Sequence, residues 1–228
     1  MSQAFDLVGQ RQQRLEKIEK LRSLGIDPYP AHANKDISNT VVTDEFGEYE
    51  GKTVSITGRV MSWRTHGKVI FADLLDQSGT AQAYIRYDVL EKDLAHGNLG
   101  WDELELIDNG DFVEVKGEVT KTKHGEPSVL ASTIRIIAKA IRPLPESLEN
   151  KEIRYRRRYI DLIVNPEIHE RFVRKAKFWK ANREFLEQNG FIEVETPVLE
   201  HVTGGADARP FITHHNDLDE DFYLRIST

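Results

Sequence analysis

The sequence predicts an α+β protein in which a helix and a small five-stranded barrel precede a second, mixed domain. Three observations lead to this fold. Apolar and polar residues alternate with period two in five segments, as in half-buried strands. A helical apolar pattern precedes these segments, and a longer one follows a proline-rich linker. We expect a helix and an extended lead-in at 1–50, a barrel domain at 51–142, a linker at 143–152 and a partial second domain at 153–228.

The amino-acid composition excludes several classes of function. The 228 residues contain no cysteine, which excludes disulfides, a thiolate nucleophile and a cysteine-type zinc site within them. No apolar run reaches the roughly 18–20 residues that cross a bilayer, so we expect a cytoplasmic protein without membrane contact. The net charge of −7 argues against indiscriminate nucleic-acid binding. The charge is uneven, because residues 151–183 hold 11 basic and four acidic side chains.

The first element is a helix expected at residues 4–24. Leu15, Ile18, Leu21 and Leu24 follow one face, and Gly25 with two nearby prolines ends the helix. The opposite face is basic. The helix therefore either packs on its own domain or forms an arm that contacts a nucleic acid such as tRNA.

The barrel strands follow in order. Residues 88–108, between the third and fourth strand, are expected to carry a helical segment. Five antiparallel strands with a helix in that position are typical of a Greek-key barrel of the OB type, although SH3-like barrels also have five strands. The predicted strands cover residues 54–60, 68–75, 80–87, 112–119 and 129–141.

The second domain begins after Pro143 and Pro145, which hold the linker extended. A long helix is expected at 166–189, followed by a strand at 191–197 and another at 222–226. The basic stretch at 154–159, with interleaved tyrosines, either contacts phosphates or forms salt bridges with acidic segments.

Several stretches carry a resemblance to a known family. The segments RYIDL at 158–162 and GFIEVETP at 190–197 resemble motif 1 of class II aminoacyl-tRNA synthetases, whose catalytic domain is an antiparallel sheet. The segment GGADARPFITHHN at 204–216 is similar to the lysyl-tRNA synthetases and does not fit the aspartyl or asparaginyl enzymes. The resemblance extends to 21–30, 121–126 and 142–145. It implies a homodimeric ligase that uses ATP and Mg²⁺ to form lysyl-adenylate and transfers lysine to tRNA-Lys.

The resemblance also implies an anticodon site on the barrel. A barrel that reads unpaired bases needs an aromatic face for stacking and polar groups for base edges. Phe71 matches the stacking residue of the family and Gln82 the residue that reads uridine, with Arg64 and Glu126 at supporting positions. From the residues alone, an ordinary core position is the favoured interpretation of Phe71, as it is for most phenylalanines in strands.

In the second domain, Gly205 and Ala206 match the loop that contacts the lysine substrate. The family usually has alanine where this sequence has Asp207. By the same resemblance, the long helix and the strand after it form the dimer interface. Its expected members are Phe172, Trp179 and Pro197.

The ATP-binding arginines of the family lie in motifs beyond these residues. We therefore expect an N-terminal portion of such an enzyme, which binds the anticodon but lacks the ATP site and any catalytic residue. A metal at His214 and His215 is not expected, because neighbouring residues of a strand point to opposite faces. The alternative is a non-enzymatic tRNA-binding and dimerisation module derived from such an enzyme.

Overall fold

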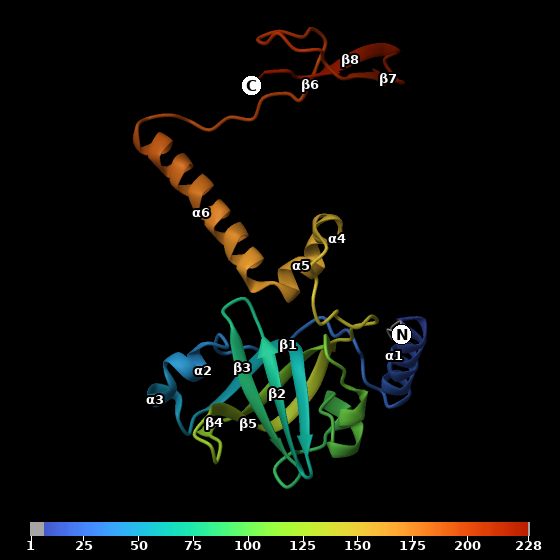
Figure 1. The fold of residues 1–228 in the computed structure, drawn as a ribbon, viewed down its shortest axis with the longest axis vertical. Helices are drawn as coiled ribbons and strands as arrows, with labels where there is room; N and C mark the ends of the chain where they lie inside the picture. Colours follow the sequence, from blue (N-terminus) through green and yellow to red (C-terminus); the bar gives the residue numbers. More distant parts are fainter. Residues whose placement is uncertain (1–6, 228) are drawn as a thin grey trace. The chain divides into compact units, whose positions relative to one another are not determined.

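The computed structural model describes residues 7–227 and divides into two compact units, Met1–Glu149 and Asn150–Thr228. The first unit contains a barrel with short helices and one longer helix around it (Figure 1). Its elements are α1 (Leu7–Ser23), α2 (Val41–Asp44), α3 (Phe46–Tyr49), β1 (Thr53–His66), β2 (Val69–Leu75), β3 (Thr80–Arg86), η1 (Leu94–His96), η2 (Trp101–Leu106), β4 (Phe112–Lys121) and β5 (Pro127–Ala138).

The barrel forms because its strands bury apolar side chains on one face only. Every second residue of β2 and β3 is buried, as period-two alternation requires. The strands pair in the order β1-β2-β3-β5-β4, and β4 pairs again with β1, which closes the sheet into a barrel. Aliphatic side chains fill its interior, among them Ile56, Leu74, Ile85, Val115 and Ile134. The predicted five-stranded barrel is confirmed.

One detail of the barrel corrects the prediction. The strands are not all antiparallel, because β3 pairs with β5 in parallel. A closed ring with an odd number of strands cannot alternate direction throughout, so one neighbouring pair must run parallel. The helical segment expected at 88–108 is present as two 3₁₀ helices, η1 and η2. Gly97 follows η1 with a positive φ of 79°, which ends that helix.

The β4–β5 pairing depends on a glycine. The register shifts between Lys116 and Gly117, and a Cβ atom at Gly117 would lie 2.0 Å from the carbonyl oxygen of Leu130. Only a residue without a side chain allows the two backbones to approach this closely.

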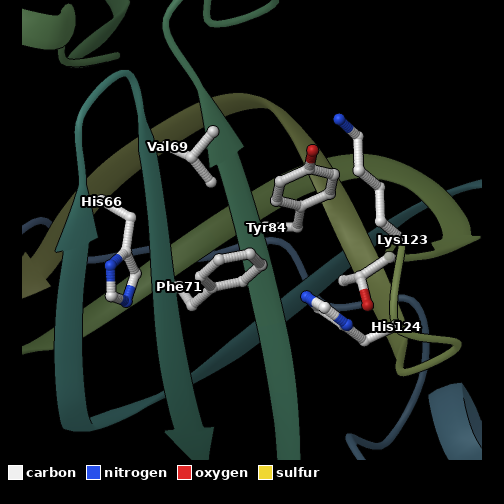
Figure 2. Close-up of a pocket in the computed structure, with 7 residues that line it drawn as sticks. His66, Val69, Phe71, Tyr84, Lys123 and His124 are labelled. Carbon is white, nitrogen blue, oxygen red and sulfur yellow. The ribbon is translucent and has the colours of Figure 1, made fainter.

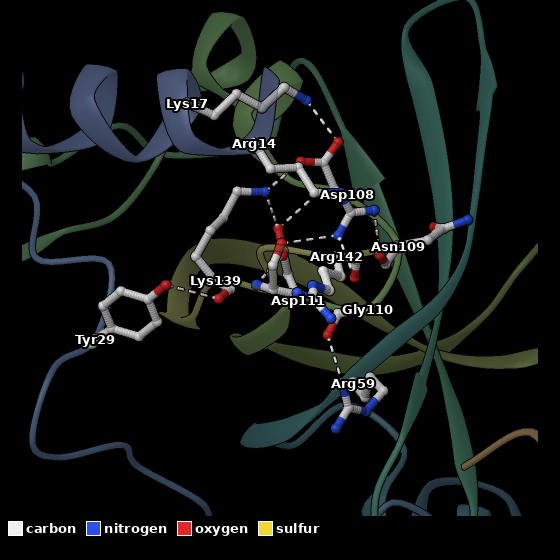
Figure 3. A network of polar contacts seen from close by, with 11 residues as sticks. Arg14, Lys17, Tyr29, Arg59, Asp108, Asn109, Gly110, Asp111, Lys139 and Arg142 are labelled. Carbon is white, nitrogen blue, oxygen red and sulfur yellow. Dashed lines mark hydrogen bonds and ion pairs between the residues drawn. The ribbon is translucent and has the colours of Figure 1, made fainter. Parts of the chain in front are cut away.

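Helix α1 is attached to the barrel partly by a polar network (Figure 3). The guanidinium of Arg14 donates to the carbonyl oxygens of Asn109 and Ala140, each at 2.9 Å. Lys17 forms an ion pair of 2.7 Å with Asp108. The two bonds from Arg14 satisfy carbonyl groups just outside β4 and β5, where the ladder no longer supplies donors.

The interactions of α1 support its interpretation as a helix packed on its own domain. Ile18 and Leu21 are buried, and Arg14, Lys17 and Lys20 all have partners within the first unit. Residues 4–6 of the predicted helix lie outside the described residues. The lead-in that follows is not extended throughout, because α2 and α3 occupy 41–49 and place Val42 in the core.

The second unit, taken by itself, contains α4 (Lys151–Arg156), α5 (Arg158–Val164), α6 (Pro166–Gln188), β6 (Leu199–Glu200), β7 (Ile212–His215) and β8 (Glu220–Leu224). Helix α4 begins inside the stretch predicted as a linker, with the side chain of Asn150 as its N-cap. Helix α6 has the proline at its first turn that the sequence indicated. The three strands form an antiparallel sheet in the order β6-β8-β7.

The predicted strand at 191–197 is wrong. These residues have no strand partner within the described chain, and β6 begins only after them, where Leu199 pairs with Leu224. Alternation of apolar and polar residues alone does not make a strand, because the backbone N–H and C=O groups must also bond an adjacent strand. Glu193 instead pairs with Arg183 of α6 at 2.9 Å.

Within residues 7–227, none of the helices combines the length and the apolar character that crossing a membrane would require.

Candidate nucleic-acid interface

The outer face of the barrel carries a row of residues from three neighbouring strands. Arg64 of β1 is the register partner of Phe71 on β2, and Phe71 is the partner of Tyr84 on β3. Phe71 and Tyr84 alternate with buried residues, so their side chains point away from the core, and Arg64 is exposed. The strand pattern therefore places one cationic and two aromatic side chains side by side.

Phe71 and Tyr84 form an aromatic platform. Their ring centroids are 5.2 Å apart and their planes differ by 7°, which is the offset parallel arrangement that aromatic rings favour. Both side chains are half-buried. Phe71 is thus not a core residue, and its ring is available to a flat ligand.

A hollow of about 450 Å³ lies over this platform. In Figure 2 the two rings lie between His66 on one side and Lys123 and His124 on the other. The hollow has no carboxylate among its lining residues, which are His66, Val69, Phe71, Tyr84, Thr122, Lys123 and His124. Its walls are therefore aromatic, cationic or neutral, which suits a base with its attached phosphate.

The loop between β4 and β5 supplies one wall of the hollow. The backbone N–H of Thr122 donates to the carbonyl of Glu126 at 2.9 Å, and that of Gly125 donates to the carbonyl of Thr122, also at 2.9 Å. Gly125 has a positive φ of 85°, a conformation that glycine adopts without strain. The tight turn holds the exposed side chains of Lys123 and His124 beside the platform.

A second row lies next to the first and is polar. Asp73 of β2 is the register partner of Ser62 and of Gln82, and Gln82 is the partner of Ser128 on β5. Asp73 accepts a hydrogen bond of 3.0 Å from Arg64. The hydroxyl of Ser128 donates to the side-chain oxygen of Gln82 at 2.9 Å. The two rows together combine a surface for stacking with groups that hydrogen-bond base edges.

The barrel brings three of the four predicted anticodon residues together. Arg64, Phe71 and Gln82 share the outer face of β1–β3. Glu126 stands at the end of the β4–β5 loop, with an exposed side chain that does not line the hollow. Sequence reasoning missed Tyr84, although its position two residues after Gln82 in an alternating strand was a usable signal.

The predicted lysine-contacting residues lie in the second unit, in the loop between β6 and β7. Gly205 has a positive φ of 85°, and a Cβ atom there would lie 2.9 Å from the Cβ of Ser227. Ala206 is exposed. The residues predicted for a dimer interface are also accessible, with Phe172 46% and Trp179 52% exposed, and Pro197 follows them in an irregular segment.

The basic stretch at the start of the second unit is largely engaged in ion pairs. Asp161 is fully buried and accepts from Arg154 and Asn165, each at 2.7 Å, and from Arg158. Burial disfavours its ionised form, but these partners hold the pKa of Asp161 below its usual value. Arg156 pairs with a neighbouring glutamate at 2.9 Å. The salt-bridge interpretation therefore fits this stretch better than a phosphate patch, although the partners are local.

His214 and His215 differ in their surroundings, as expected for neighbours in a strand. His214 lies 3.0 Å from Asp221, whereas the ring of His215 lies 5.7 Å from that of Phe222. Within residues 7–227, no group of three or more His, Asp or Glu side chains is arranged to hold a metal ion.

Comparison with known proteins identifies two families along the chain. Residues 54–137 match the family described as OB-fold nucleic acid binding domain. Residues 150–228 match the family described as tRNA synthetases class II (D, K and N). The first match covers the strands that carry the aromatic platform, and the second covers the whole second unit.

Curated relatives agree with both matches. The lysine–tRNA ligase of Carboxydothermus hydrogenoformans is 46% identical over 217 residues, which cover 94% of this chain and 43% of the relative. Those of Thermoanaerobacter sp. strain X514 and Clostridium perfringens strain 13 are 44% and 45% identical over 219 residues, covering 94% of this chain and 42% of each relative. The chain thus spans about two fifths of the length of the curated relatives it matches.

Proposed function

The chain is a homologue of the class II lysine–tRNA ligases, and on that premise we propose that its first unit binds the anticodon loop of tRNA-Lys. The observation that carries the proposal is the stacked pair of Phe71 and Tyr84 on the outer face of an OB-type barrel. Anticodon bases are unpaired, so they can stack on aromatic rings and expose their edges. Phe71 supplies the stacking surface in this proposal, while Gln82 reads a base edge and Arg64 and Glu126 support it.

For the whole protein we propose the ATP-dependent activation of lysine and its transfer to tRNA-Lys in the cytoplasm. The lysine carboxylate attacks the α-phosphate of ATP, giving lysyl-adenylate and pyrophosphate. Mg²⁺ accompanies ATP in this reaction, but the described residues offer no carboxylate cluster suited to it, so we assign it to none of them. Gly205 and Ala206 contact lysine in this proposal, because a loop without bulky side chains lets the backbone approach a ligand.

The second unit also contributes a homodimer contact in this proposal. Helix α6 carries four exposed aromatic side chains, Phe172, Phe178, Trp179 and Phe185. Exposed apolar groups gathered on one helix favour burial against another protein surface. The segment through Pro197 continues this contact.

The anticodon proposal is tested by binding of the chain to an RNA stem-loop with the anticodon of tRNA-Lys. Removing the Phe71 ring in Phe71→Ala should cost roughly 1–3 kcal/mol, the usual worth of one base–aromatic stack. That loss corresponds to a rise in Kd of about 5- to 150-fold. Fluorescence anisotropy at constant salt measures it.

Phe112→Ala is the matched control. Phe112 begins β4, outside the hollow, and packs under the guanidinium of Arg59 with 4.2 Å between the charge and the ring centroid. The same truncation there should leave Kd unchanged. Equal affinities of wild type and a folded Phe71→Ala variant would exclude the stacking role. Lysine-dependent ATP–pyrophosphate exchange by the full-length protein tests the ligase proposal separately.

A further inference from the structure

The side chain of Gln82 is anchored at one end of its amide group. Its oxygen accepts the hydroxyl of Ser128 at 2.9 Å, and Ser128 is fully buried beneath the outer face. Within residues 7–227, the amide nitrogen of Gln82 has no hydrogen-bond partner, although it carries two donors. The protein therefore fixes which end of this amide faces a ligand.

Both carboxylate oxygens of Asp73 already accept from other donors, and the structure shows no bond from Gln82 to either. Asp73 is the register partner of Gln82, but one carboxylate oxygen accepts from Arg64 at 3.0 Å and the other from the hydroxyl of Ser62. The outer face thus presents donors from Gln82 in the polar row and from Arg64 in the row beside it.

The hydroxyl of Ser128 has a single hydrogen and two acceptors within reach. The carbonyl oxygen of Glu126 is 3.3 Å away, whereas the oxygen of Gln82 is 2.9 Å away. The shorter contact is the stronger one, because hydroxyl hydrogen bonds are optimal near 2.7–2.8 Å. Ser128 is buried and cannot exchange this bond for one with solvent.

We propose that Ser128 is a positioning residue that turns the nitrogen of Gln82 outward, so that the interface selects a base edge with a carbonyl oxygen over one with an amino group. The inference rests on the proposed anticodon function and extends it to the chemistry of the base. Uracil has a carbonyl oxygen where cytosine has an amino group, so the two pyrimidines differ at this contact. The amino group of cytosine would face the amide nitrogen of Gln82, and because both are donors they cannot bond each other, which disfavours cytosine.

The test compares RNA stem-loops that carry uridine or cytidine at each of the three anticodon positions. Wild type should prefer uridine at one position. Ser128→Ala frees the amide to rotate and should reduce that preference by roughly 3- to 10-fold, the effect of one hydrogen bond. Ser128→Thr keeps a hydroxyl and should keep the preference. Ser132→Ala is the matched control, since Ser132 on the same strand bonds the carbonyl of Lys116 at 3.0 Å.

Three outcomes are distinguishable. If wild type binds none of the stem-loops, the proposed function fails. If it binds them and Ser128→Ala weakens uridine and cytidine loops equally, Ser128 is only structural and the inference is overturned. A wild-type preference for cytidine would also overturn it, because the amide of Gln82 would then face the opposite way, with Ser128 donating to the carbonyl of Glu126.

Discussion

Replacing Lys139 with methionine tests whether the buried ion network holds the barrel together. The ammonium group of Lys139 is fully buried and lies 2.6 Å from a carboxylate oxygen of Asp111, which is fully buried as well (Figure 3). It also pairs with Asp108. Methionine is unbranched and apolar like the lysine stem, so Lys139→Met removes the charge while disturbing the packing little.

The loss of stability arises because Asp111 stays buried after Lys139 is replaced. Asp111 still accepts from the backbone N–H groups of Asp108 and Ala140, at 2.7 and 2.8 Å, but loses the ammonium group that is paired with it. Removing one member of a buried ion pair costs about 3–5 kcal/mol, because the other charge stays uncompensated. We therefore expect Lys139→Met to lower the free energy of unfolding by that amount. Adding Asp111→Asn removes the orphaned charge and should restore at least about 2 kcal/mol.

The pH dependence gives a second readout. Burial already raises the pKa of Asp111, against the influence of Lys139, and the loss of Lys139 raises it further. A carboxyl whose pKa is higher in the folded than in the unfolded state stabilises the fold below its unfolded pKa. That contribution is lost as pH rises through the folded pKa. The penalty of Lys139→Met should therefore be largest near neutral pH and shrink towards pH 4.

Denaturant unfolding in a Trp179→Phe background measures these effects on the barrel alone. The remaining tryptophans, Trp63 and Trp101, both pack against the barrel core, so their fluorescence reports the first unit. A loss below about 1 kcal/mol, or a double variant no more stable than Lys139→Met, would refute the reasoning.

Three further predictions concern other parts of the chain. Gly117→Ala should unfold the barrel or cost more than about 4 kcal/mol by thermal denaturation, because its Cβ would lie 2.0 Å from the oxygen of Leu130. Burial opposes ionisation of Asp76, but the hydrogen bonds that it accepts hold its pKa well below the usual value. Asp76→Asn should therefore cost about 1–3 kcal/mol at pH 7 and progressively less as pH falls below 4, as acid unfolding curves will reveal. Trp179→Glu should convert a dimer to monomers in sedimentation equilibrium, because the exposed indole belongs to the proposed contact; an unchanged mass contradicts the interface.

The strands of the barrel were predictable because their pattern is local. In β2 and β3 the alternation of buried and outward residues is complete, so periodicity located both strands. The parallel β3–β5 pairing was not predictable in this way, since it arises from closure of the ring. The prediction of a strand at 191–197 was wrong because the local alternation is present, but no strand within the described chain pairs with these residues.

The residues of the candidate site also differ in whether the sequence alone could identify them. Phe71 and Gln82 were identified through family resemblance, and Tyr84 could have been added from the alternation of β3 alone. The contribution of His124 required the barrel itself, because it comes from a loop that lies about 40 residues after β3 in sequence and is brought alongside by the β3–β5 pairing. Ser128 is similar, since only a known register reveals that it lies next to Gln82.

The net charge of −7 is compatible with the proposed interface. The hollow contains no carboxylate, and Asp73 beside it is paired with Arg64, so the acidic surplus lies elsewhere. A duplex offers mainly phosphates, and its affinity for a protein depends on many cationic contacts that this chain does not concentrate there. An unpaired loop offers bases, which gain from stacking and edge contacts whatever the overall charge. In the proposed function, the aromatic, donor-rich face binds a splayed loop, and the acidic remainder of the protein disfavours nonspecific duplex binding.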